Sequence, residues 1–269
     1  TSSESDGGSI ELVTTKKSHQ APFGLIWRDT CPTSLYQERP LKGEVEFSGV
    51  DFAYGDKKVL QKLNFKIKPG SKFAFVGSTG AGKTTITNLL NQFYAPAAGE
   101  IYYDGLPLSQ LKKTSLRRSI AMVFQETYLF SGTIAENILY GNSHASLAEV
   151  KRISKLVGAD SFIRNLPKGY HTRFDKSLDL SAGQKQLIAI ARALIANPPV
   201  LILDEATANV DTRLEQLVQK GLAQLMKGRT VLIIAHRLST ISNADTIVVL
   251  DKGKIVEQGT HRQLLAKKG

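Results

Sequence analysis

A glycine-rich loop contains the first residues whose types and spacing could do chemistry. Residues 77–85 fit the pattern G-x-x-x-x-G-K-[ST]. Such glycines let backbone N–H groups converge on phosphate oxygens, while Lys83 would reach the β- and γ-phosphates and the Thr84 hydroxyl would bind Mg²⁺. The loop lies between a short buried strand at 72–76 and a helical pattern that begins at Lys83, so a helix N-terminus also faces the anion. The predicted phosphate loop consists of Gly77, Ser78, Thr79, Gly80, Ala81, Gly82, Lys83, Thr84 and Thr85.

A pair of carboxylates follows a second buried strand. Asp204 and Glu205 come directly after the apolar run 200–203. In open α/β sheets, ligands bind beyond the carboxyl ends of the strands. Asp204 would therefore hold Mg²⁺, directly or through water, and Glu205 would polarise a water for attack on the γ-phosphate. Alone, two acids at this place are also typical of a solvated helix N-terminus; the phosphate loop upstream favours the catalytic interpretation.

Alternating strands and helices would have to position these groups. Apolar and polar residues alternate over 44–54 and 59–67, which predicts half-buried strands around a turn at Gly55 and Asp56. Continuous β-branched runs downstream are typical of strands buried on both faces of a parallel sheet. These runs are 200–203, 230–234 and 246–250, and helical patterns cover about 83–94, 182–196, 213–226 and 238–243. The pattern predicts an α/β fold, with an inserted and mostly helical region between 106 and 196.

Composition narrows the class of protein. The 269 residues include 35 Lys and Arg against 24 Asp and Glu, a net charge of +11, and the single cysteine Cys31 excludes an internal disulfide framework. No apolar run approaches the roughly 20 residues of a membrane helix. The excess charge leaves nucleic acid, an anionic membrane or a phosphate ligand as candidate partners. Residues 1–42 show no sustained periodicity and are predicted to be a linker or tail.

One segment resembles a family signature. Residues 180–184 read Leu-Ser-Ala-Gly-Gln, followed by an alanine-rich helical pattern and then Asp204-Glu205. This is similar to the Leu-Ser-Gly-Gly-Gln signature of the nucleotide-binding domains of ATP-binding-cassette (ABC) transporters, and the resemblance covers about residues 43–266. It implies a P-loop NTPase with a RecA-like parallel sheet core, an N-terminal antiparallel β subdomain, and an inserted α-helical subdomain at about 126–196. Residues 1–42 would then link to a missing transmembrane domain, and 43–269 would be the ATPase domain.

The resemblance implies roles for residues that carry little signal alone. Tyr54 matches an aromatic that stacks on adenine, Gln125 a glutamine that reaches Mg²⁺ and senses the membrane domain, and His236 a histidine that holds the attacking water with Glu205. On this basis Lys83, Glu205 and His236 are the expected catalytic set, and Thr84, Gln125 and Asp204 the expected metal set. The cofactors implied are ATP and Mg²⁺.

Other matches imply a head-to-tail dimer. In the family, residues matching Ser181 and Gly183 contact the γ-phosphate of the ATP held by the partner domain, and Gln184 completes that segment. Physically, a serine hydroxyl and amides at a helix N-terminus form an anion site, although a simple helix N-cap has the same geometry. Asp211 lies where the family has its dimer-crossing loop.

The string at 129–141, Leu-Phe-Ser-Gly-Thr-Ile-Ala-Glu-Asn-Ile-Leu-Tyr-Gly, resembles exporter-type cassettes. The implied partners are a transmembrane domain, on this chain or separate, and a second cassette in a homodimer or a heterodimer. The implied location is the cytoplasmic face of a plasma or inner membrane.

The chain departs from the family pattern at three places. They are Ala182 in the signature, Leu187 where many members carry Arg, and the stretch 172–179, which lacks the exporter Gly-Glu-Arg-Gly and puts the usual membrane-domain contact in doubt.

Two alternatives compete with a transport motor. The charge of +11 would suit a soluble cassette ATPase that acts on nucleic acid. A non-catalytic, nucleotide-gated regulatory module would share the phosphate loop, but the presence of both Glu205 and His236 argues against it.

Overall fold

The structure is a computed structural model that describes residues 41–124, 127–175, 178–204, 212–234, 241 and 243–266. Six of the described strands form a main sheet in the order β12-β11-β3-β10-β9-β6. All neighbours in this sheet are parallel except β11 and β12. Its strands are β3 (Lys72–Gly77), β6 (Ile120–Val123), β9 (Val200–Asp204), β10 (Thr230–Ile234), β11 (Thr246–Asp251) and β12 (Lys254–Gly259). The predicted α/β fold with a parallel core is confirmed.

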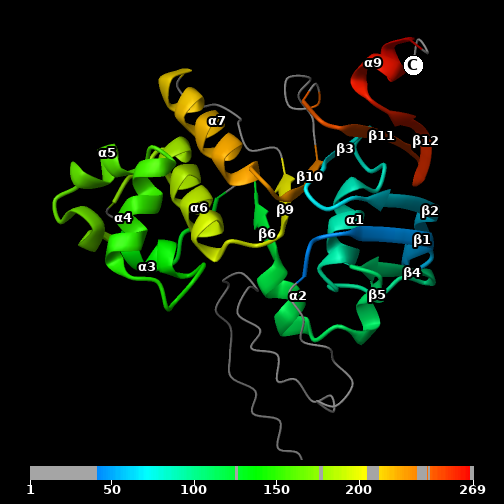
Figure 1. The fold of residues 1–269 in the computed structure, drawn as a ribbon, viewed down its shortest axis with the longest axis horizontal. Helices are drawn as coiled ribbons and strands as arrows, with labels where there is room; N and C mark the ends of the chain where they lie inside the picture. Colours follow the sequence, from blue (N-terminus) through cyan, green and yellow to red (C-terminus); the bar gives the residue numbers. More distant parts are fainter. Residues whose placement is uncertain are drawn as a thin grey trace, which may run out of the picture. The chain divides into compact units, whose positions relative to one another are not determined.

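A second sheet is antiparallel and covers one face of the main sheet. Its described strands, in the order β2-β1-β4-β5, are β1 (Val45–Tyr54), β2 (Lys57–Ile67), β4 (Ala98–Tyr103) and β5 (Leu106–Pro107). Between the two sheets lies helix α1 (Lys83–Leu90), which shares one apolar cluster with both of them (Figure 1).

Helices cover the opposite face of the main sheet. The longest described ones are α6 (Ala182–Ala196) and α7 (Thr212–Met226), which pack on each other. Alternate residues of the parallel strands β3, β6, β9, β10 and β11 enter the two clusters: Phe73 and Phe75 face the antiparallel sheet, whereas Ala74 faces the helices. Because both faces are covered, these strands read as continuous apolar runs, as the sequence predicted.

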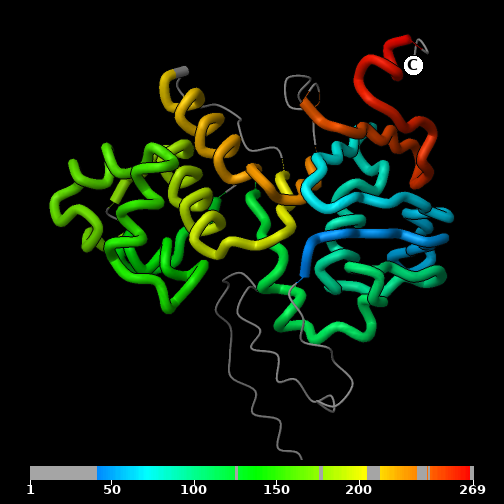
Figure 2. Tube along the Cα trace, viewed as in Figure 1, coloured from blue at the N-terminus to red at the C-terminus, as the bar shows by residue number. Residues whose placement is uncertain are grey.

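A helical lobe packs against α6 on the far side from the antiparallel sheet, as the chain trace shows (Figure 2). The lobe contains α3 (Ile134–Leu139), α4 (Leu147–Leu156), α5 (Asp160–Arg164), the 3-10 turn η3 (Gly169–His171) and the short pair β7 (Gly132–Thr133) and β8 (Arg173–Phe174). The remaining described elements are η2 (Leu108–Gln110), α2 (Lys113–Ser119) and α9 (His261–Ala266). Within the described part of the chain, no helix is long and apolar enough to cross a membrane.

Several sequence expectations need correction. Residues 106–123 are not simply helical, because they include β5 and the edge strand β6 of the main sheet. Strands β4 and β12 were also not predicted from the sequence. Helix α1 ends at Leu90 instead of about Tyr94, because Gln92 takes a left-handed conformation (φ 54°) that turns the chain. The predicted helix at 238–243 falls largely outside the described residues.

Candidate functional site

The predicted phosphate loop joins β3 to α1. Gly77 is the last residue of β3, Gly82 is the N-cap of α1, and α1 begins at Lys83. Ser78, Thr79 and Gly80 are exposed, whereas the side chain of Ala81 is buried. The loop therefore presents its central backbone to solvent at the N-terminus of a buried helix, which is the arrangement that binds phosphate.

Backbone geometry in the loop requires glycine at two places. Gly77 has φ 150°, and a Cβ there would lie 2.2 Å from the carbonyl oxygen of Leu250 on the neighbouring strand β11. Gly82 has φ 107°, and its Cβ would lie 2.5 Å from a methyl group of Leu60 on β2. The loop thus lies against the β11 backbone at a distance that a side chain at Gly77 does not allow, and the positive φ of Gly82 favours glycine beside β2.

The ammonium group of Lys83 lies under the loop. Its Nζ donates hydrogen bonds to the carbonyl oxygens of Gly77 (2.7 Å) and Ser78 (3.0 Å), and the residue is only 5% exposed. Thr84 follows in the first turn of α1 and is exposed. A buried cation next to exposed backbone amides makes this corner of the molecule attractive to a polyanion.

The main sheet brings Asp204 to the same edge as the loop. In the parallel ladder, Asp204 pairs with Ile234, and Ile234 pairs with Phe75, two residues before the loop begins. Asp204 is half-buried at the end of β9. Its carboxylate and the Thr84 hydroxyl are oxygen donors, the type that Mg²⁺ prefers. Gln125, Glu205, Asp211 and His236 lie outside the described residues.

Tyr54, at the end of β1, is held by residues that the sequence did not single out. Its hydroxyl oxygen accepts a hydrogen bond from Asn88 Nδ2 of α1 (3.3 Å). Its ring makes perpendicular contacts with Phe52 (centroids 4.8 Å apart) and with Tyr94 (5.1 Å). Tyr54 remains 39% exposed, so part of the ring is available to a ligand.

The signature segment begins α6. Ser181 is its N-cap: Ser181 Oγ accepts from the backbone N–H of Gln184 (3.3 Å), and Gln184 Oε1 accepts from the N–H of Ser181 (3.0 Å). The predicted N-cap is therefore present, as a reciprocal capping box. Ser181 and Ala182 are exposed and Gly183 is buried. Leu187, where many family members carry Arg, is 0% exposed inside the apolar cluster, which suits leucine.

The signature segment and the phosphate loop belong to opposite faces of the main sheet. Leu180 and α6 lie in the cluster with the helical lobe, whereas Ala81 and α1 lie in the cluster with the antiparallel sheet. The structure brings together Tyr54, the loop and the strand edge with Asp204. It places Ser181, Gly183 and Gln184 on a separate exposed helix end.

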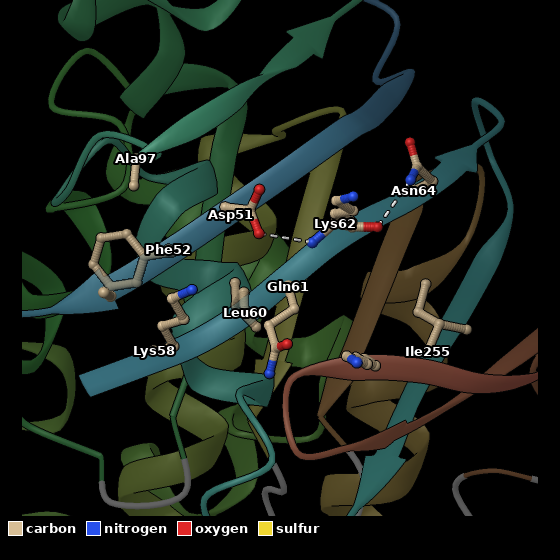
Figure 3. Close-up of a pocket in the computed structure, with 11 residues that line it drawn as sticks. Asp51, Phe52, Lys58, Leu60, Gln61, Lys62, Asn64, Ala97 and Ile255 are labelled. Atoms are coloured by element: carbon tan, nitrogen blue, oxygen red, sulfur yellow. Dashed lines mark hydrogen bonds between the residues drawn. The ribbon is translucent and has the colours of Figure 1, made fainter. Parts of the chain in front are cut away.

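A cavity of about 810 Å³ lies elsewhere, over β1, β2 and β12 (Figure 3). No residue of the phosphate loop lines it. Lys58, Lys62 and Lys254 contribute its cationic groups. Lys62 is left-handed (φ 47°), and its backbone is held by Asp51 Oδ1, which accepts from its N–H (3.0 Å), and by Asn64 Nδ2, which donates to its carbonyl (2.8 Å). The predicted phosphate loop is therefore separate from this cavity.

Comparison with known proteins identifies the family. The family model described as ABC transporter matches residues 60–208. The chain is 51% identical over 240 residues to an uncharacterised ABC transporter ATP-binding protein, YknV, of Bacillus subtilis (strain 168), covering 88% of this chain and 40% of that protein. It is 49% identical over 227 residues to an ATP-dependent lipid A-core flippase of Syntrophus aciditrophicus (strain SB), covering 84% and 38%.

A solved structure agrees with the fold. The chain superposes on a bacterial Atm1-family ABC exporter with ATP bound, with a TM-score of 0.81 and 43% identity, covering 88% of this chain and 42% of that one. The chain spans about two fifths of the length of these relatives. On the strength of the phosphate loop, the signature helix and these matches, the chain belongs to the ABC transporter family as a nucleotide-binding domain.

Proposed function

We propose that this chain is the ATP-hydrolysing motor of an ABC exporter. The observation that carries the proposal is the meeting of the phosphate loop, the buried Lys83 and the Asp204 carboxylate at one edge of the parallel sheet. In the family, this edge binds the triphosphate. Two relatives are named for what they act on, the lipid A-core flippase of Syntrophus aciditrophicus and a fatty acid ABC transporter ATP-binding/permease protein of Mycobacterium bovis. The substrate of the proposed exporter would be set by its transmembrane domain.

The proposed chemistry is attack of water on the γ-phosphate. Thr84 and Asp204, with Gln125, would hold Mg²⁺, which when bound neutralises charge on the phosphate oxygens. Glu205 follows the last residue of β9 in the sequence and would orient the attacking water as its base. Lys83 would hold the phosphates, and His236 would fix the γ-phosphate and the water.

A second copy or a second cassette would complete the site. The exposed Ser181 and Ala182 lie at the N-terminus of α6, where the helix dipole favours an anion. These residues belong to the opposite face of the sheet from the loop of their own chain. The proposal is therefore a head-to-tail dimer in which Ser181, Gly183 and Gln184 of each chain face the ATP of the other, with Asp211 at the seam.

We also propose a contact surface for the transmembrane domain, the aromatic patch of Tyr128, Phe130 and Tyr140. Phe130 stacks on Tyr140 (4.4 Å) and meets Tyr128 at 5.5 Å, and Tyr128 and Tyr140 are 73% and 69% exposed. Strand β7 lies between Phe130 and Tyr140 in the sequence and pairs with β8, which belongs to the stretch where the family usually contacts the membrane domain and where this chain departs from the family pattern. Exposed aromatic clusters of this kind mark protein interfaces.

The proposed domain plan follows from these assignments. Residues 1–42 would connect to the transmembrane domain, residues 43–269 would form the ATPase domain, and about 126–196 would be its helical subdomain. The complete transporter would then hold this domain at the cytoplasmic face of a plasma or inner membrane.

The substitution Glu205→Gln tests the motor. Removing the base while keeping the size of the side chain should lower ATP turnover by at least about 10²-fold and leave ATP binding in place. The variant should therefore accumulate as an ATP-dependent dimer in size-exclusion chromatography. Glu215→Gln, on the described helix α7, is the matched control and should retain turnover. Unchanged turnover in Glu205→Gln would overturn the assignment of Glu205.

The nucleic-acid alternative makes a different prediction. A cassette that acts on DNA or RNA would bind it with an affinity that falls steeply with salt. The motor proposal expects no such binding at physiological ionic strength. Fluorescence anisotropy with labelled duplex and single strands separates the two functions.

A further inference from the structure

The aromatic side chain of Tyr54 is contacted by residues of α1 and of the turn that follows it. Asn88 Nδ2 donates to Tyr54 Oη (3.3 Å), and the Tyr94 ring stands perpendicular to the Tyr54 ring, with an interplanar angle of 89°. Phe52, which is 6% exposed in the core, makes the second perpendicular ring contact with Tyr54. Perpendicular aromatic pairs are favourable because the positive edge of one ring meets the negative face of the other.

The position of Tyr94 depends on a specific turn. Gln92 is left-handed (φ 54°), its N–H donates to the carbonyl of Leu89 (2.9 Å), and its Nε2 donates to the carbonyl of Leu108. The N–H of Phe93 donates to the carbonyl of Asn88 (2.9 Å). A left-handed conformation costs a non-glycine residue about 1–2 kcal/mol, and these hydrogen bonds hold it. The turn thus places the ring of Tyr94 against the ring of Tyr54. If α1 continued beyond Leu90, Tyr94 would lie elsewhere.

Helix α1 connects this aromatic group to the phosphate loop. Lys83, which lies under the loop, is the first residue of α1, and Asn88 lies five residues later on the same helix. At a rise of about 1.5 Å per residue, the two are about 7.5 Å apart along the axis. A rigid helix therefore connects Lys83, at the phosphate loop, to Asn88, which forms a hydrogen bond with Tyr54.

We infer that Asn88 and Tyr94 are positioning residues for the nucleobase: they fix the ring of Tyr54 at the orientation and distance from the phosphate loop that an adenosine triphosphate requires. The inference rests on the proposed function, because it takes Tyr54 as the stacking partner of the base. Neither residue needs to contact the nucleotide. Their effect is confined to the base end of the ligand, since the phosphate loop keeps its own contacts through Lys83 and the start of α1.

Two probes separate the base end from the phosphate end. The chain is titrated with the non-hydrolysable analogue adenylyl imidodiphosphate and, in parallel, with inorganic tripolyphosphate, which has no base. Tyr94→Ala and Asn88→Ala should each weaken the adenine analogue about 3- to 10-fold, the range expected for one aromatic pair or one hydrogen bond, and leave tripolyphosphate unchanged. Tyr94→Phe keeps the ring and should bind like the parent.

A double-mutant cycle tests the contact itself. Tyr54→Phe removes the hydroxyl that Asn88 contacts, so Asn88→Ala should have no further effect in that background. Both sites tolerate substitution: Tyr94 is 47% exposed, and alanine is a better helix former than asparagine at Asn88.

The outcomes distinguish the inference from the proposed function. If Tyr54→Ala weakens the adenine analogue but Tyr94→Ala and Asn88→Ala do not, the inference is wrong and the proposed function stands. If the two variants weaken tripolyphosphate as much as the adenine analogue, they disturb the loop, and the inference is also overturned. If Tyr54→Ala itself has no effect, the base is not held at Tyr54, and the stacking assignment fails with the inference.

Discussion

Single glycines decide whether the phosphate loop can form, and they do so for different reasons. Gly77 needs both its backbone conformation and the space beside Leu250, because a Cβ would lie 2.2 Å from a carbonyl oxygen on β11. Gly80 also has positive φ (83°), but nothing lies within 4 Å of a Cβ there. A side chain at Gly77 would therefore add a steric clash to an unfavourable backbone conformation, whereas a side chain at Gly80 would meet only the unfavourable conformation.

We expect Gly77→Ala to destabilise the fold far more than Gly80→Ala. Gly80→Ala should cost about 1–2 kcal/mol, the price of left-handed backbone in alanine. Gly77→Ala adds a clash with backbone that cannot move without breaking the β3–β11 ladder, so a loss above about 3 kcal/mol is expected. Urea unfolding of both variants measures the difference. Equal losses would contradict the close approach of β3 and β11.

At the scale of elements, a capping box fixes the start of α3. Thr133 Oγ1 accepts from the N–H of Glu136 (3.1 Å), and the Glu136 carboxylate accepts from the N–H of Thr133 (2.6 Å). The hydrogen bonds that the carboxylate accepts from Thr133, first from its backbone N–H and then from its side chain, hold the pKa of Glu136 below its ordinary value, and Arg173 of β8 lowers it further. The ionised form is thus the one that caps the helix.

The depressed pKa predicts an acid-sensitive contribution to stability. Since the pKa of Glu136 is lower in the folded chain than in the unfolded chain, its stabilisation is complete above the unfolded pKa and is lost as pH falls through the folded one. Glu136→Gln keeps an oxygen acceptor for the cap but does not titrate. The difference in unfolding free energy between parent and variant should therefore shrink from about pH 6 to about pH 3. A difference that grows in acid would contradict the lowered pKa.

At the scale of the whole molecule, one half-buried cation connects the sheet-facing helix to the helical lobe and the aromatic patch. Arg192 of α6 donates to Asn137 O (2.8 Å), to Asn137 Oδ1 (3.0 Å) and to Tyr128 O (3.3 Å), and its guanidinium lies over the Phe130 ring at 5.2 Å. Burial lowers the pKa of Arg192 from its usual value. Arg192 of α6, the helix that begins at the signature, therefore anchors the aromatic patch to the rest of the domain.

This arrangement predicts that the aromatic patch is needed for coupling to the transmembrane domain and is not needed for nucleotide binding. Tyr128→Ala and Tyr140→Ala should lower transport and substrate-stimulated ATPase activity in the complete transporter, because the contact with the transmembrane domain is lost. Nucleotide binding by the chain should stay unchanged, since both side chains are mostly exposed. Val256→Ala, on an exposed site of β12, is the matched control. Equal losses in the control, or none in the two tyrosine variants, would contradict the proposed surface.

One run of basic residues lies mainly on a single strand. Residues 57–72 contain six lysines and no acidic residue, and they form β2 and the start of β3. Lys66 pairs with Glu44 (2.8 Å) and Glu46 (3.0 Å) of the neighbouring segment. Four of these lysines therefore lie on β2, at one edge of the antiparallel sheet, apart from the phosphate loop, where Lys83 is the relevant cation.

Local sequence was enough to determine the phosphate loop, the signature cap and the strands buried on both faces. Glycine spacing, a Ser-x-x-Gln cap and continuous apolar runs act within a few residues, so their meaning does not depend on distant parts of the chain. The same holds for the boundaries of α6, which match the predicted helix at 182–196.

Only the tertiary structure decided which distant segments meet. The strand order, the edge strand β6, the early end of α1 at Gln92 and the grip of Asn88 and Tyr94 on Tyr54 all depend on pairs far apart in the sequence. Such contacts leave no periodic signal, because the energy that selects them comes from packing between elements and not from the propensity of either one.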